Sequence, residues 1–207
     1  MPQNSFIPEV PPALREPSIF SQWLFEDPTY LLAIIAAIGA LAAWQLFRST
    51  RARPASLAAV ITIALCAAIW LISSSISTPR ERIVAATWSL IRTTTAADVD
   101  ALSPLLADRA RLDNTRGSLN MDKASILARV KATLGGPFKL KDWAVVRMQA
   151  AADNENKGQS QFYIRVTPEI TGAPDLSWWR ITWQREGDAW KVSLIEPMSG
   201  TAIDTLR

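Results

Sequence analysis

The sequence has no histidine and a single cysteine among its 207 residues. Without an imidazole, a Ser-His-Asp triad, a Cys-His pair, a histidine general base and a histidine metal ligand are all excluded. The lone Cys66 cannot form a disulfide within the chain. No G-x-S-x-G nucleophile motif occurs, and no group of carboxylates has the spacing of metal ligands. The sequence therefore predicts neither a bound metal nor a cofactor.

Features that bind nucleic acids are also missing. Basic and acidic residues are mixed, the formal net charge is +3, and no basic stripe or arginine-rich arm occurs. Gly135 and Gly136 end a predicted helix instead of opening one, and no Lys-Ser/Thr pair follows them. They therefore do not form a phosphate-binding loop. We expect no nucleic acid partner.

Two long runs, 29–47 and 54–78, contain no charged residue. A bilayer core about 30 Å thick needs roughly 20 helical residues, and both runs are that long. We predict transmembrane helices over 29–47 and 56–77, joined by a basic loop over 48–55, with the lipid bilayer as a partner. The alternative is a buried hairpin of a soluble protein, but soluble helices seldom run this long without a charge.

The basic loop gives the predicted orientation. Arg48, Arg51 and Arg53 lie in it without an acidic residue, so the positive-inside rule places it in the cytoplasm. The N-terminal tail and the C-terminal domain would then both lie on the outer, periplasmic or extracellular, side. Arginines also follow the second run and compete with the loop, but Glu81 lies among them. Neither run contains Asp, Glu, Lys or Arg, so the hairpin is better interpreted as an anchor than as an ion path.

The tail, 1–28, has a composition of its own. Five of its first 17 residues are proline, which favours an extended segment. Trp23 and Phe25 then lie in a short apolar stretch before the first run. This stretch either lies on the membrane surface or binds a partner, so both residues are candidate partner contacts.

The remainder, 79–207, predicts a soluble α+β domain. Apolar residues recur at helical spacing in three segments and then alternate in four, and a further short strand is expected at 108–113. Three helices followed by an antiparallel meander predict helices that cover one face of a curved four-stranded sheet. The helices are expected near 79–94, from Asp98, and over 122–134, and the strands over 138–152, 160–168, 176–185 and 189–196.

This order of elements resembles the nuclear transport factor 2-like, or SnoaL-like, cone fold. The resemblance covers about 79–198 and excludes the apolar runs. It rests on element order and on local patterns: PRERIVAATW at 79–88, DVDALSPLLA at 98–107 and WQREGDAWKV at 183–192. The sheet of that family wraps a pocket that is enzymatic in some members, binds small ligands in others, or serves only in dimerisation. The resemblance therefore does not select a function.

The resemblance implies a pocket with polar residues inside the cone. Catalytic members commonly place an Asp-His pair or a Tyr and an Asp there, and this chain departs from the first pattern because it has no histidine. Tyr163 and Arg165 would share one strand face, and a Tyr donor beside an Arg can bind a carboxylate or a phosphate. The alternative is that they face solvent. The candidate pocket residues are Trp88, Asp113, Arg147, Tyr163 and Arg165.

Trp178 and Trp179 are a further candidate contact. Adjacent residues of a strand point to opposite faces, so one of the two lies outside the core. That indole would anchor a partner or be covered by a helix or by a second subunit.

The leading hypothesis is a membrane-anchored, non-catalytic accessory module. Its cone domain would bind a partner protein or a small ligand at the membrane surface, and a homodimer is also expected. One alternative is a hydrolase, isomerase or dehydratase that uses Tyr163 with a nearby Arg or Asp. Another is a structural subunit of a membrane protein complex, with contacts made by the hairpin and the tail.

Overall fold

The computed structural model describes residues 12–14, 29–48, 52–75, 77–113 and 120–199. These residues fall into two units. One unit holds the two apolar helices. The other holds everything from Pro79 onward together with the short segment Pro12–Leu14.

The first unit is an antiparallel pair of helices, α2 (Thr29–Arg48) and α3 (Ala52–Ser75). Both helices are long and apolar enough to cross a membrane. A side chain at Gly39 would collide with Thr62 of the facing helix, so the glycine allows the two backbones to approach closely. Helix α3 begins before the predicted residue 56 because Pro54 is tolerated in the first turn of a helix.

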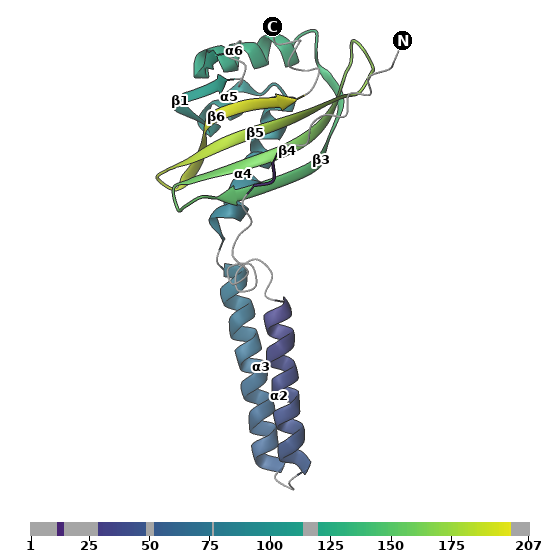
Figure 1. Ribbon diagram of the computed structural model, residues 1–207, viewed down its shortest axis with the longest axis vertical. Helices are drawn as coiled ribbons and strands as arrows, with labels where there is room; N and C mark the ends of the chain where they lie inside the picture. The colour runs from purple at the N-terminus through teal and green to yellow at the C-terminus, as the bar shows by residue number, and fades with distance from the viewer. Residues whose placement is uncertain (1–11, 15–28, 49–51, 76, 114–119, 200–207) are drawn as a thin grey trace. The chain divides into compact units, whose positions relative to one another are not determined.

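The second unit begins with helices and ends with strands (Figure 1). Its helical part comprises α4 (Pro79–Thr95), α5 (Val99–Leu102), the 3₁₀ turn η2 (Ser103–Leu105) and α6 (Lys123–Leu134). Its strands are β1 (Leu106–Asp113), β2 (Asn120–Asp122), β3 (Leu140–Ala152), β4 (Lys157–Pro168), β5 (Asp175–Glu186) and β6 (Ala189–Ser199).

The sheet has the order β2-β1-β6-β5-β4-β3. Strands β3 to β6 form the predicted antiparallel meander and lie side by side in Figure 1. The α+β fold class is thus confirmed, but the sheet is larger than the four strands expected. Strand β1 pairs with β6 in parallel and β2 pairs with β1, so the sheet has six strands and is mixed.

Helix α4 packs its apolar stripe on the inner face of the sheet. Ile83, Thr87, Leu90 and Ile91 recur at helical spacing and are all buried. A side chain at Gly158 of β4 would collide with Ile83, so this glycine brings the strand close to the helix.

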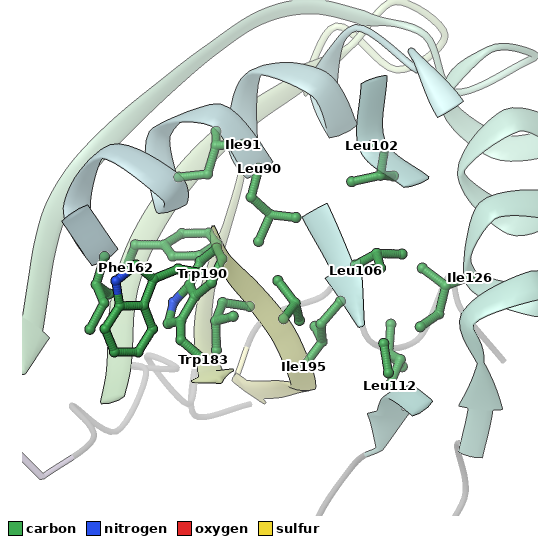
Figure 2. Packing of buried hydrophobic residues seen from close by; sticks show 14 of the residues in the cluster. Leu90, Ile91, Leu102, Leu106, Leu112, Ile126, Phe162, Trp183, Trp190 and Ile195 are labelled. Atoms are coloured by element: carbon green, nitrogen blue, oxygen red, sulfur yellow. The ribbon is translucent and has the colours of Figure 1, made fainter. Parts of the chain in front are cut away.

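The core lies between this helical layer and the inner sheet face. Figure 2 shows side chains from α4, α5, α6 and the strands pointing toward one another. They include Leu90, Leu102, Leu106, Ile126, Phe162, Trp183 and Ile195. Any cavity between the helices and the sheet is therefore lined by the inward-facing residues of the strands.

Candidate functional site

A cavity of about 260 Å³ lies inside the domain, between the helices and the inner face of the sheet. Residues from α4, α5 and α6 form one wall, and the inward-facing residues of β4 and β5 form the other. Figure 2 shows several of these residues within the core. The lining is mainly aliphatic and aromatic and includes Leu102, Leu106, Ile126, Phe162, Ile164 and Trp179.

The polar residues of the lining are few, and two of their hydroxyls are already engaged. Thr95 Oγ1 donates to Ile91 O at 2.8 Å, within its own helix. Ser177 Oγ accepts from Trp179 Nε1 at 2.9 Å. Arg129 and Asp175 are the charged residues of the lining, and both are half-buried. The cavity thus offers apolar walls with one cation and one carboxylate.

None of the five predicted pocket residues lies in the described lining of this cavity. Three of them lie together on the outer face of the sheet. Arg147 of β3 is paired directly with Tyr163 of β4, and Arg165 follows on the same face. Arg165 Nη2 lies 3.4 Å from Asp142 Oδ2, in an exposed ion pair. Tyr163 and Arg165 therefore share a strand face, as predicted, but it is the face turned away from the cavity.

The other two predicted residues lie apart from that group. Trp88 is half-buried on α4, where the guanidinium carbon of Arg92 lies 6.0 Å from the centroid of its ring. Asp113 ends β1, opposite Asn120 of β2. The structure does not bring either residue to Tyr163.

The two adjacent tryptophans point to opposite faces of β5. Trp179 lines the cavity. Trp178 lies on the outer face, where its ring stacks on Tyr163 with centroids 4.8 Å apart. It is nevertheless only 6% exposed. Trp23 and Phe25, the other candidate contacts, lie outside the described residues.

The cavity could not be predicted from the sequence because its lining consists of ordinary core residues. A cavity arises from how helices and strands pack, and no local pattern distinguishes a cavity-lining leucine from any other core leucine. Arg129 was the detectable signal. It is a charged residue that follows the apolar pair Ile126 and Leu127 of α6.

No protein family model and no curated protein matches this chain. Solved structures do match it. An NTF2-like protein from Cytophaga hutchinsonii aligns with a TM-score of 0.51 at 16% identity, over 59% of this chain and 99% of its own. An NTF2-like protein of unknown function from Pseudomonas putida aligns with a TM-score of 0.51 at 12% identity, over 62% of this chain and 91% of its own. Another from Prochlorococcus marinus aligns with a TM-score of 0.50 at 15% identity, over 63% of this chain and 100% of its own.

Identities this low show the fold and not an activity. The matches span about three fifths of the chain, which agrees with the length of the α+β unit. The α+β unit therefore has the nuclear transport factor 2-like cone fold.

Proposed function

We propose that this protein is a membrane-anchored, non-catalytic binding module whose cone domain holds a small apolar ligand. The observation that carries the proposal is the apolar cavity of about 260 Å³ on the inner face of the sheet. Pockets for drug-sized ligands measure roughly 300–1,000 Å³. The ligand would accordingly be a small molecule, or the apolar part of a larger one.

The lining supports binding over catalysis. Tyr163, which the enzyme alternative requires, is on the opposite face of β4 from the cavity. Ser177 and Thr95 form hydrogen bonds within the protein. Arg129 and Asp175 would then orient a polar group of the ligand instead of reacting with it.

The helical hairpin would be the anchor. Large apolar side chains of α2 and α3 are exposed, and such a surface is compatible with lipid. Examples are Ile38, Leu41, Val60 and Ile63. At the end of α2, the guanidinium carbon of Arg48 lies 5.5 Å from the ring centroid of Trp44, an arrangement typical of a membrane interface. In the proposed orientation the loop after Arg48 is cytoplasmic and the cone domain is on the outer side.

A comparison of co-purified molecules tests the ligand. The full chain would be purified in mild detergent, and small molecules would be extracted from it and identified by mass spectrometry. Val130→Phe fills the cavity with a larger side chain, whereas Leu176→Phe adds a similar group on the exposed outer face. The parent protein and the two variants are purified in the same way, so their extracts contain the same background of lipid.

We expect a small apolar species in the parent protein and in Leu176→Phe, and its loss from Val130→Phe. Identical extracts from all three proteins would disprove a resident cavity ligand. A protein partner that remains bound to all three would favour the structural-subunit alternative instead.

A further inference from the structure

The centre of the outer sheet face is buried, although no described helix packs on it. Gln161 of β4 is 2% exposed, and Trp178 of β5 and Ala151 of β3 are each 6% exposed. Arg147 and Gln184, toward the edges of the same face, are exposed. An uncovered sheet face would expose alternate residues along every strand. Some other part of the chain must therefore cover the centre.

One described segment approaches this area. The carbonyl oxygen of Pro12 lies 3.3 Å from the terminal amide of Gln161, although the two residues are 149 positions apart. Pro12, Ala13 and Leu14 belong to the same compact unit as the cone domain. The segment thus reaches the middle of the buried area.

The terminal amide of Gln161 lies between Arg180 and the Pro12 carbonyl. Its Oε1 accepts from Arg180 Nε and Nη2 at 3.0 and 2.8 Å. These bonds orient the amide because their donor is charged, so the 3.3 Å approach of the Pro12 carbonyl is a packing contact. The side chain of Gln161 thus lies beneath the segment.

The outer face has the chemistry that binds extended proline-containing chains. Such chains adopt a polyproline conformation without internal hydrogen bonds, and aromatic surfaces with a few polar groups recognise them. Tyr163 and Trp178 form a stacked pair on this face, and the next cross-strand pair along it is Gln161 with Arg180. Aromatic and polar groups thus alternate beside the position of Pro12.

We propose that the outer face of the sheet is a binding surface for an extended, proline-containing segment, and that its occupant is this chain's own N-terminal segment at Pro12–Leu14. While bound, the segment prevents a second copy from pairing through the same face. This inference is independent of the proposed ligand, because the cavity is lined by the inward-facing residues of the same strands.

Hydroxyl-radical footprinting of the full chain in detergent tests the proposal, since it reports oxidation of each tryptophan separately. Deletion of residues 2–14 should raise oxidation of Trp178 several-fold. Trp183, which is 0% exposed in the core, should not change and serves as the folding control. A synthetic peptide of residues 6–17, added to the deletion variant, should restore the protection of Trp178.

Two substitutions on the same face give a matched comparison within the intact chain. Gln161→Ala removes the buried amide beneath Pro12 and should raise Trp178 oxidation. Gln184→Ala shortens an exposed amide on β5 and should not. This pair keeps the proposal testable if the deletion variant fails to fold. Equal effects of the two substitutions would overturn it.

The molecular mass, from light scattering, separates the remaining outcomes of the deletion. If Trp178 stays protected and the mass is unchanged, another part of the chain covers the face and the proposal is overturned. If Trp178 stays protected while the mass doubles, a second copy has occupied the vacated face, and the peptide should then dissociate the dimer. A dimer that the peptide leaves intact would also overturn the proposal.

Discussion

Ser160 connects the helical layer to the sheet through a buried chain of hydrogen bonds. Trp183 Nε1 donates to Ser160 Oγ at 2.8 Å, and Ser160 Oγ lies 2.9 Å from Thr87 Oγ1. Thr87 Oγ1 donates to Ile83 O at 2.7 Å. If the Ser160 hydroxyl donates to Thr87 Oγ1, then each of the three side chains donates one hydrogen bond to the next group. All three polar groups are then satisfied without water.

Ser160→Ala should therefore destabilise the domain. It removes the acceptor of a buried indole N–H, and an unsatisfied buried polar group costs about 1–3 kcal/mol. Urea denaturation of the full chain in detergent, followed by tryptophan fluorescence, would give the loss in free energy of unfolding. Ser89→Ala, at an exposed position of α4, should change it by less than about 0.5 kcal/mol. Equal losses would mean that the buried chain of hydrogen bonds does not stabilise the fold.

Ala97 has a backbone conformation that alanine disfavours. Its φ is 54°, and it ends α4 with bonds from Ala97 N to Thr94 O and from Asp98 N to Thr93 O. This is the pattern that places a left-handed residue, usually glycine, just beyond a helix. The backbone of Ala97 is therefore strained, and removal of its methyl group would relieve this strain.

We expect Ala97→Gly to raise the free energy of unfolding by about 0.5–1 kcal/mol. Ala96→Gly, one residue earlier and without a positive φ, should lower it by up to about 1 kcal/mol. Opposite signs for adjacent substitutions are the expected result in the same urea titration. A loss of stability for both would show that the left-handed residue carries no strain.

At the scale of elements, α6 is held at its N-terminus by a charged cap. Asp122 Oδ1 accepts from Ser125 N at 2.9 Å. Hydrogen bonds from Ser125 lower the pKa of Asp122 below its ordinary value of 3.8. A lowered pKa stabilises the fold above that ordinary value, and the contribution disappears as the pH falls through the folded-state pKa.

Asp122→Asn should keep the cap and remove its titration, because asparagine caps helices about as well as aspartate. The parent should be the more stable protein at about pH 7, and its advantage should shrink below about pH 4. Thermal unfolding of the two proteins, measured across this range, gives the difference directly. A difference in stability that does not vary with pH would contradict the lowered pKa of Asp122.

Some helices and strands could be predicted from local sequence pattern, whereas the pairing of distant strands could not. Helix α4 is marked at its start by Thr78-Pro79, and β3 to β6 are marked by alternation, so both could be derived from local pattern. The parallel pairing of β1 with β6 could not, because it joins Leu106 to Val192 across most of the domain. The cavity and the contact of Pro12 with Gln161 depend on packing between distant segments in the same way.

The candidate site shows the same limit. Alternation placed Tyr163 and Arg165 on one strand face, but it could not show which face the helices cover. The two tryptophans of β5 were placed correctly on opposite faces. Which of them lines the cavity, and what covers the other, required the tertiary structure.

For the whole molecule, the contact between Pro12 and Gln161 bears on the proposed membrane topology. A tail and a domain that touch must lie on the same side of a membrane, so the helices between them cross it an even number of times. Two spanning helices meet this condition. In the proposed topology α2 and α3 are these two helices, and the positive-inside rule predicts that the loop between them is cytoplasmic.

Single cysteines in a Cys66→Ser background test this topology. Gln3→Cys and Asn154→Cys should react with a membrane-impermeant thiol reagent in intact cells. Ser49→Cys, in the basic loop, should react only after the membrane is permeabilised. Labelling of Ser49→Cys in intact cells, with protection of the other two positions, would reverse the orientation. Labelling on different sides for Gln3→Cys and Asn154→Cys would rule out the hairpin.

The contact at Pro12 also gives the domain two attachments to the hairpin. One is the covalent connection before Pro79, and the other runs through the bound tail to α2. A protease that cuts the chain only at residues 76–78 would leave the domain held non-covalently, at the high effective concentration of a tethered pair. Shedding of the domain from a membrane would then require dissociation of the tail as well as cleavage, so the affinity of the tail would set the rate of release.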